Sequence, residues 1–442
     1  MFRYWRIGSR AVVTAALVLL VVAAYRNINW VFINRSFTTN FVLHELGVTA
    51  YVFHDGWQEV HDWWFDEHLQ AVDATPYRKF LAGRAKRRQA ALTTMPVVKK
   101  RYVIYIQMEA IAASALKLKL NGHYVAPFLR QLRNHSLWFE NAFDETDAGR
   151  TSDAEFLALT GVIPIQGNPV FTNQTLYQVP AVPRIFDKAG YTTISVHGFE
   201  GQFWHRKASH KALGYEKQYY MKDLKQDDMI GWGISDRSVM KQAVGILAAQ
   251  KGKVFMHIIT LSSHHPFDGV RKRFGGPDKG IVNDYLRSVQ YLDGSVKLFF
   301  HLLKEKGLLK HCVIALYGDH DSGITRQIIK YRDPPNHDPA AHDKITMMIY
   351  GLNRTGIVKR PSGLQDLVPT ILTAQGLPVP ATAVGGLPDS HISVLLPGGG
   401  AIVGMDSRGS PVKQRIPVNI RKLTLLSLHR PKDLAAATGG KP

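Results

Sequence analysis

Four short runs of apolar residues limit the folds that this chain can adopt. They cover residues 102–106, 192–196, 254–261 and 312–317. Each run is as long as a strand and shorter than a typical helix, and near-continuous apolar runs are typical of parallel strands covered on both faces. Strand and helix patterns alternate from residue 101 to about residue 395. The sequence therefore predicts an α/β domain with a mostly parallel central sheet flanked by helices.

Each run stops at polar residues that bind metals or phosphates. In chain order, the residues at these ends are Glu109, His197, His264 with His265, and Asp319 with His320. In open α/β sheets, a ligand binds beyond the carboxyl ends of the strands. We therefore expect these side chains to meet at one site, and we expect the chain to be an enzyme.

A segment with two hydroxyl side chains lies between the first and second runs. Residues 148–157 read AGRTSDAEFL. We interpret them as a loop that opens a helix, with Thr151 or Ser152 at the N-cap and Glu155 in the first turns. Capping alone accounts for such residues. The positive end of a helix also suits a phosphate, and a hydroxyl bound to a divalent cation has a lowered pKa and acts as a nucleophile.

Three of the strand-end residues form a set of metal ligands. Glu109, Asp319 and His320 offer oxygen and nitrogen atoms without a thiolate, which suits Mn²⁺, Mg²⁺ or Zn²⁺. Any one of them alone would pass as a hydrogen-bonded loop anchor. Together with the hydroxyl of Thr151 they predict a four-ligand site for one divalent metal.

These motifs occur in the order found in a known family. The matching segments are residues 106–109, 149–156, 196–198, 203–206, 259–267 and 317–320. They are similar to the catalytic domain of the lipoteichoic acid synthase and phosphoglycerol transferase family, in the sulfatase-like branch of the alkaline phosphatase superfamily. The resemblance covers about residues 101–395, and residues 364–372 resemble the helix that follows the core in such enzymes. It implies an alkaline-phosphatase/sulfatase-like sheet in a catalytic domain of residues 101–395.

The resemblance implies the ligands and the nucleophile. Glu109, Thr151, Asp319 and His320 would hold one divalent metal, with Mn²⁺ as the first choice and Mg²⁺ or Zn²⁺ as alternatives. Thr151 would also be the nucleophile.

The resemblance also implies a substrate pocket. His197, Trp204 and Arg206 would line the phosphoglycerol site, with Arg206 gripping the phosphate. Of the histidine pair, His264 is preferred as the residue that hydrogen-bonds the phosphate or protonates the departing alkoxide. His265 is assigned to substrate binding. Residues 321 and 342, an aspartate and a histidine, are candidate supports for the metal ligands.

The implied activity is that of a membrane-anchored, extracytoplasmic phosphoglycerol transferase. It would move glycerol phosphate from phosphatidylglycerol to the hydroxyl of a glycan or glycerol-phosphate acceptor, through a phosphothreonine-type covalent intermediate. Phosphoethanolamine transfer and phosphodiester hydrolysis are alternatives, and a non-catalytic relative that binds envelope polyanions is a third. Formylglycine-type sulfatase chemistry is disfavoured, because Thr151 does not lie in a Cys/Ser-x-Pro-x-Arg motif.

The N-terminal residues predict a membrane location. Residues 1–10 form a basic start with three arginines, and residues 11–25 are apolar or small. We expect the start to be cytoplasmic and residues 11–25 to be a single transmembrane anchor or, alternatively, a signal peptide, with the catalytic domain in the periplasm. A helix of that run would span roughly 22 Å, short of the ~30 Å hydrocarbon core. Lipoteichoic acid synthases carry several such helices, so a single transfer onto a glycan is expected as readily as polymerisation.

Charge is distributed unevenly along the chain. The formal net charge is +20, and nine Lys and Arg residues fall within residues 78–101 without an acid. We interpret residues 26–100 as interfacial helices followed by a basic linker, which either attracts an anionic membrane surface or is merely solvated. Nucleic acid is not expected as a partner, because no binding motif is present. Residues 396–442 predict a hairpin around residues 406–409 and a basic tail. The single cysteine, Cys312, excludes an intramolecular disulfide and suits the core.

Overall fold

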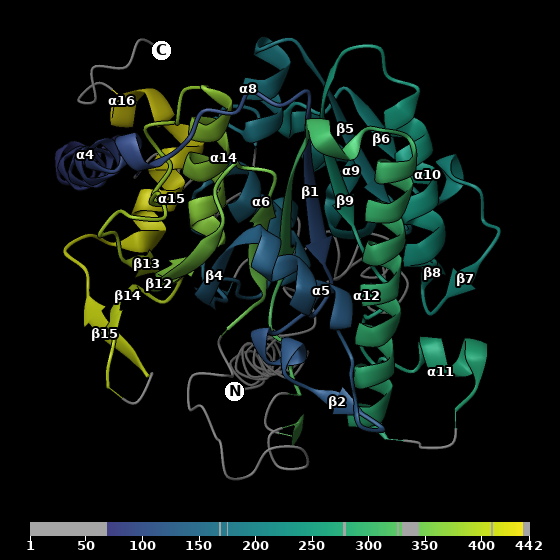
Figure 1. Cartoon of the computed structure of the whole chain (residues 1–442). Helices are drawn as coiled ribbons and strands as arrows, with labels where there is room; N and C mark the ends of the chain where they lie inside the picture. The colour runs from purple at the N-terminus through teal and green to yellow at the C-terminus, as the bar shows by residue number, and fades with distance from the viewer. Residues whose placement is uncertain are drawn as a thin grey trace, which may run out of the picture.

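A computed structural model describes residues 69–167, 169–174, 176–276, 280–324, 327–328, 344–407 and 410–435. Its centre is an eight-stranded sheet with the order β12-β4-β11-β10-β1-β9-β5-β6 (Figure 1). The strands are β1 (Tyr102–Met108), β4 (Ser136–Phe143), β5 (Tyr191–His197), β6 (Lys217–Tyr219), β9 (Lys253–Ile259), β10 (Cys312–Gly318), β11 (Met347–Tyr350) and β12 (Gly356–Gly363). Strand β11 pairs antiparallel with β10 and β4, whereas the other neighbours pair parallel. The predicted mostly parallel α/β sheet is confirmed.

The four apolar runs form β1, β5, β9 and β10, which lie side by side in the sheet. All four run in the same direction. Met108 at the end of β1 is level with Gly318 of β10, and Gln107 is level with Ile259 of β9. Ile259 is in turn level with His197 of β5. The residues that follow these strands therefore share one edge of the sheet, as the sequence predicts.

Helices cover both faces of the sheet because alternate side chains of each strand point to opposite sides. On β1, Ile104 and Ile106 belong to one apolar core, whereas Val103 and Tyr105 belong to another. The first core includes side chains of α5 (Pro127–Leu132), α10 (Asp236–Ala248) and α12 (Ile281–Glu305). The second includes side chains of α6 (Thr151–Thr160), α8 (Val182–Lys188), α14 (Leu367–Gln375) and α15 (Ile420–His429).

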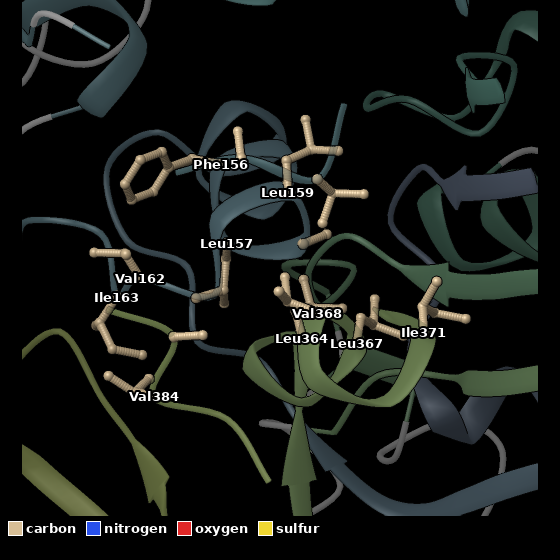
Figure 2. Close-up of a cluster of buried hydrophobic side chains, with 14 of the residues drawn as sticks. Phe156, Leu157, Leu159, Val162, Ile163, Leu364, Leu367, Val368, Ile371 and Val384 are labelled. Atoms are coloured by element: carbon tan, nitrogen blue, oxygen red, sulfur yellow. The ribbon is translucent and has the colours of Figure 1, made fainter. Parts of the chain in front are cut away.

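Helix α6 is enclosed on every side, and all ten of its residues are buried. Figure 2 shows Leu157 and its neighbours meeting side chains of the 3-10 helix η8 (Leu364–Asp366) and of α14, among them Val368. Together, η8 and α14 include residues 364–372, which the sequence predicts as the helix after the core. Packing of this kind fixes the axis of α6, and hence the position of its first residue.

The basic stretch expected to be a linker is instead largely a helix, α4 (Thr75–Ala90). Arg84 and Arg88 are buried and do not face solvent. Arg88 Nη1 donates to the carbonyls of Ala383 and Gly385 at 2.8 and 2.9 Å, and Arg84 Nη2 donates to that of Ser393 at 2.6 Å. The linker prediction was wrong because these guanidinium groups satisfy backbone carbonyls of a distant segment, which permits their burial.

The C-terminal part contains the expected hairpin, a third short strand and two helices. Strands β14 (Gly400–Met405) and β15 (Pro411–Arg415) pair antiparallel, and β13 (Val394–Leu395) completes a small sheet. The segment expected to be a basic tail forms α15 and α16 (Pro431–Ala435), and α15 places Leu423 and Leu426 in the core. The other short elements are α7 (Val170–Asn173), α9 (Arg206–Leu213), α11 (Gly269–Phe274), β2 (Lys119–Leu120), β3 (His123–Tyr124), β7 (Met229–Ile230) and β8 (Gly233–Ile234).

The predicted anchor at residues 11–25 and the interfacial helices before residue 69 lie outside the described residues. Within the part of the chain that the structure describes, no helix combines the length and the apolar character needed to cross a bilayer.

Candidate active site

The site forms where β1 and β10 end and α6 begins. Glu109 directly follows β1, Asp319 directly follows β10, and Thr151 is the first residue of α6. The Thr151 hydroxyl lies 3.3 Å from Glu109 Oε2, to which it donates. Gln107, near the end of β1, donates from Nε2 to the Thr151 carbonyl at 3.1 Å. The sheet edge therefore holds both the backbone and the side chain of the candidate nucleophile.

The predicted metal ligands converge. Ligand atoms of Glu109, Asp319 and His320 all lie within 4.8 Å of one another. His320 Nε2 is 3.4 Å from Glu109 Oε1 and 3.6 Å from Asp319 Oδ1. Asp319 Oδ2 is buried and has no hydrogen-bond partner among the described residues. Burial and the Glu109 carboxylate raise the pKa of Asp319 well above its usual value. A divalent cation would relieve both effects, so these residues fit one.

The start of α6 differs from the expected cap. Arg150 occupies the N-cap with φ +43°, and no side chain caps the helix. Neither Thr151 nor Ser152 is therefore the N-cap residue. The Ser152 hydroxyl donates to the Gly149 carbonyl at 2.9 Å. Of the two hydroxyls, that of Thr151 is the one directed to Glu109, a candidate metal ligand.

Arg150 also connects α6 to the segment after β10. Its Nη2 lies 2.9 Å from both Asp321 Oδ1 and the Asp321 carbonyl, and His320 Nδ1 lies 2.7 Å from the same carbonyl. Arg150 Nη2, which donates, also lies 2.9 Å from His320 Nδ1, so these contacts fix the position of the ring, with Nε2 facing Glu109 and Asp319. Asp321 thus supports His320, as the sequence predicts, whereas His342 lies outside the described residues.

A tight turn brings Arg206 into the interior. Trp204 and His205 have φ values of +58° and +51°, which residues other than glycine rarely adopt. Arg206 follows as the first residue of α9 and is 1% exposed, and the Trp204 ring is also buried. This turn therefore directs Arg206 towards the site, where the side chain is buried and not solvated.

Arg206 pairs with Glu155, whose role the sequence interpretation missed. Its Nε and Nη2 donate to the Glu155 carboxylate at 3.0 and 2.8 Å, and His210 Nε2 lies 2.8 Å from the same carboxylate. Burial alone would raise the pKa of Glu155, but the Arg206 charge and the His210 hydrogen bond outweigh burial and lower it. Glu155 lies in the first turns of α6, as expected, but it is buried. It is the ionised anchor of a buried arginine.

The pocket residues retain unused hydrogen-bonding atoms. Arg206 Nη1 is buried and has no partner among the described residues. His197 Nδ1 lies 3.0 Å from the Ile259 carbonyl and so donates to it, which leaves Nε2 as an acceptor. Burial, followed by the charge of Arg206, lowers the pKa of His197 to about 3. These two side chains therefore offer a fixed cationic donor and a neutral acceptor.

The two histidines after β9 have different surroundings. His264 directly follows Ser263, whose hydroxyl donates to the Glu109 carbonyl at 2.7 Å. Its ring lies 4.2 Å from that of Trp232, an aromatic neighbour that the sequence interpretation missed. His265 is exposed, and its ring contacts Phe267 at 5.4 Å. Of the pair, His264 is thus the one that adjoins the residue bonded to Glu109, a candidate metal ligand.

Comparison with known proteins agrees with this geometry. The family described as Sulfatase matches residues 101–377, which is more than half of the chain. Lipoteichoic acid synthase 2 of Bacillus subtilis strain 168 is 28% identical over 363 residues, covering 78% of this chain and 55% of that protein. The chain therefore spans little more than half of that relative's length.

Two solved structures share the fold. A lipoteichoic acid synthase from Listeria monocytogenes has a TM-score of 0.64 at 22% identity, covering 79% of this chain and 97% of that chain. A phosphoglycerol transferase from Streptococcus pyogenes, in complex with sn-glycerol-1-phosphate, has a TM-score of 0.51 at 18% identity, covering 67% and 82%. The chain belongs to the sulfatase family, in which it is similar to lipoteichoic acid synthases.

Proposed function

We propose that this chain is a metal-dependent phosphoglycerol transferase that moves glycerol phosphate from phosphatidylglycerol to an acceptor hydroxyl. The observation that carries the proposal is the Thr151 hydroxyl at the start of a buried helix, 3.3 Å from a carboxylate of the candidate metal site. Support also comes from the relatives, which are named as lipoteichoic acid synthases, and from a structure named as a phosphoglycerol transferase.

In the first step, Thr151 Oγ1 attacks the phosphorus of phosphatidylglycerol. The Oγ1–phosphorus bond forms, the bond from phosphorus to the diacylglycerol oxygen breaks, and glycerophosphate remains on the threonine. Thr151 reacts as its alkoxide, after the hydroxyl proton that points to Glu109 Oε2 has been lost to solvent, and His264 gives a proton to the departing diacylglycerol alkoxide. A cation held by Glu109, Asp319 and His320 would lower the pKa of the threonine hydroxyl and offset the phosphate charge.

In the second step, an acceptor hydroxyl attacks the same phosphorus. It gives its proton to His264, its oxygen bonds to phosphorus, and the bond from phosphorus to Thr151 Oγ1 breaks. This returns the threonine alkoxide, which a cation held by Glu109, Asp319 and His320 would stabilise. Glycerol phosphate on a glycan or on a growing glycerol-phosphate chain is the product. If water were the acceptor, the enzyme would be a phosphodiesterase.

The remaining pocket residues select and orient the donor headgroup. Arg206 donates from its free Nη1 to a phosphate oxygen, and its place is fixed by two hydrogen bonds to Glu155. His197 is neutral at physiological pH because burial and the Arg206 charge lower its pKa to about 3. Its Nε2 accepts a hydrogen bond from a glycerol hydroxyl, and the buried Trp204, two residues before Arg206, would pack against the glycerol. An ammonium headgroup would also donate to that nitrogen, but the positive charge of Arg206, which helps to lower the pKa of His197, disfavours a second cation there.

We place the reaction at the outer face of the plasma membrane, on the basis of the apolar run at residues 11–25, which lies outside the described residues. The donor is a membrane lipid, so a tethered enzyme would meet it at the bilayer surface. We propose Mn²⁺ as the resident cation, with Mg²⁺ and Zn²⁺ as alternatives.

Replacement of the nucleophile tests the proposal. Thr151→Ala should abolish release of diacylglycerol from labelled phosphatidylglycerol, and mass spectrometry of the wild-type chain should find glycerophosphate on Thr151. Ser152→Ala is the matched control, because the Ser152 hydroxyl is committed to the Gly149 carbonyl, and it should retain turnover. Undiminished turnover in Thr151→Ala would exclude this nucleophile.

A headgroup competition separates the two transferase activities. Phosphatidylglycerol and phosphatidylethanolamine are offered together in the same vesicles, and the product headgroups are measured. Preferential transfer of glycerol phosphate is expected, whereas preferential transfer of phosphoethanolamine would favour the alternative activity. A metal-loaded chain that releases diacylglycerol from neither lipid would indicate the non-catalytic alternative.

A further inference from the structure

Exposed apolar side chains gather beside the candidate site. Met229, Trp232 and Phe274 are 40%, 45% and 58% exposed. They lie on β7, on the turn between β7 and β8, and at the end of α11. Figure 1 shows α11 at the periphery of the molecule, near β7 and β8. Isolated exposed apolar residues are ordinary, but a group of large ones marks an interaction surface.

These elements form one unit. Gly269, the first residue of α11, packs so closely on the β7–β8 turn that a Cβ there would come within 2.9 Å of the Gly231 nitrogen. The Arg273 guanidinium lies 5.4 Å from the centroid of the Phe274 ring. The Phe274 ring also lies 5.7 Å from the Tyr291 ring of α12, so packing holds both ends of α11. We call Met229, Trp232, Lys272, Arg273 and Phe274 the rim.

The outermost charges of the rim are positive. The Lys272 side chain is 68% exposed and pairs at 2.8 Å with Asp268, which is 24% exposed. The Arg273 side chain is 53% exposed and pairs at 3.4 Å with Asp228, which is 25% exposed. The acids thus lie beneath the cations, and the layer that an approaching surface meets is cationic. The chain as a whole carries a net charge of +20, so an anionic surface is attracted to it.

The rim opens onto the site. A cavity of about 510 Å³ is lined by rim residues, among them Met229, Trp232 and Lys272, and it extends to His264. The rings of Trp232 and His264 are 4.2 Å apart. The neighbouring Ser263 donates to the carbonyl of Glu109 at 2.7 Å. A molecule that enters from the rim therefore reaches the histidine next to the candidate metal ligands.

We propose that the rim docks on an anionic phospholipid bilayer and presents the site to lipid headgroups. Tryptophan favours the headgroup level, apolar side chains enter the acyl boundary, and Lys and Arg bind anionic headgroups. This combination favours a bilayer over a glycan, which would need polar side chains to pair with its hydroxyls. The proposal deepens the proposed function by assigning the lipid-facing surface, and its link to turnover rests on that function.

Depth measurements on the full chain, reconstituted in phosphatidylglycerol and phosphatidylethanolamine vesicles, test the docking. Cys312→Ser removes the only cysteine, and a Phe274→Cys substitution then carries an environment-sensitive fluorophore. Ile357→Cys is the matched control, because Ile357 is 53% exposed and lies on the edge strand β12. Nitroxide-labelled lipid should quench the fluorophore at position 274 and leave position 357 nearly unquenched. Equal quenching at both positions would overturn the proposal.

Turnover gives a second measurement with a built-in control. Met229→Ser combined with Phe274→Ser should lower release of diacylglycerol from vesicles on the order of tenfold, since two apolar anchors are lost. The same variant should turn over a short-chain, monomeric phosphatidylglycerol like the wild type, and Met229→Leu with Phe274→Trp should restore activity on vesicles. An equal loss on both donors would overturn the docking role.

The proposal and the proposed function fail in distinguishable ways. If neither donor is turned over but lipid still quenches the fluorophore at position 274, the proposed function fails and the docking surface stands. If a soluble glucan oligosaccharide shifts the emission at position 274 and lipid does not quench it, the rim is an acceptor site and the bilayer proposal is overturned.

Discussion

The buried ion pair between Arg206 and Glu155 makes a prediction that separates stability from activity. Arg206→Met leaves a buried carboxylate whose other partner is His210, and Glu155→Leu leaves a buried guanidinium. Removing one partner of a buried pair costs about 3–5 kcal/mol. We therefore expect each single variant to lose free energy of unfolding of that order.

The double variant should be more stable than either single variant. With both charges gone, the remaining cost is the loss of one hydrogen bond to His210 Nε2, because His210 Nδ1 keeps its contact with Ser195 Oγ at 2.8 Å. An unsatisfied buried group of that kind costs about 1–3 kcal/mol. The coupling between the two substitutions should thus amount to several kcal/mol.

Urea unfolding followed by tryptophan fluorescence measures stability, and release of diacylglycerol measures turnover. All three variants should be inactive, because the Nη1 donor of Arg206 is absent or displaced. Arg360→Met is the matched control. Arg360 forms an ion pair of 3.0 Å with the buried Asp366, and this pair is not part of the candidate site. The variant should be destabilised yet active. A double variant as unstable as the worse single variant, or an active Glu155→Leu, would refute the reasoning.

Three further predictions concern pH, backbone space and the metal. Burial lowers the pKa of His257 to about 3 from 6.5, so the unfolded chain binds this proton at a higher pH than the folded chain does. The free energy of unfolding should therefore fall as pH decreases below 6.5, by at most ~1.4 kcal/mol per pH unit for this residue. His257→Gln should show a shallower pH profile in urea titrations. A Cβ on Gly149 would overlap Asp153 Oδ1, whereas one on Gly294 meets open space, so Gly149→Ala should lose turnover and thermal stability while Gly294→Ala gains about 0.5–1 kcal/mol. Mn²⁺ should raise the melting temperature of the wild-type chain but not of Asp319→Asn, and chelation should abolish turnover; an equal shift in both proteins would place the metal elsewhere.

The sequence predicts the sheet edge because both signals for it are local. Each apolar run is a buried strand, and each polar residue follows its strand directly, so parallel pairing alone brings Glu109 and Asp319 together. The antiparallel strand β11, inserted between β10 and β4, has no local signal of this kind. Its position depends on pairing between segments that are distant in the chain.

Buried charges were predicted less well, for two physical reasons. Glu155 did carry a signal, because it interrupts a helix whose neighbours Phe156 and Leu157 are apolar, and a charge in such a helix requires a buried partner. Arg84 and Arg88 carried none, since their partners are backbone carbonyls about three hundred residues later. A run of arginines that binds carbonyls has the same sequence pattern as one that faces water.

Helix α4 has a consequence for how the domain is made. It leaves the ribosome before the rest of the domain, but the carbonyls that receive Arg84 and Arg88 belong to residues 383–393. The helix α16, near α4 in Figure 1, comes later still, and Arg78 donates to the carbonyl of Asp433 there. Because contacts between distant segments form late, synthesis must be nearly complete before α4 has a partner. A chain stalled or cut before residue 383 would leave α4 undocked, with Tyr77 and Leu81 exposed, a defect that quality-control proteases are suited to detect.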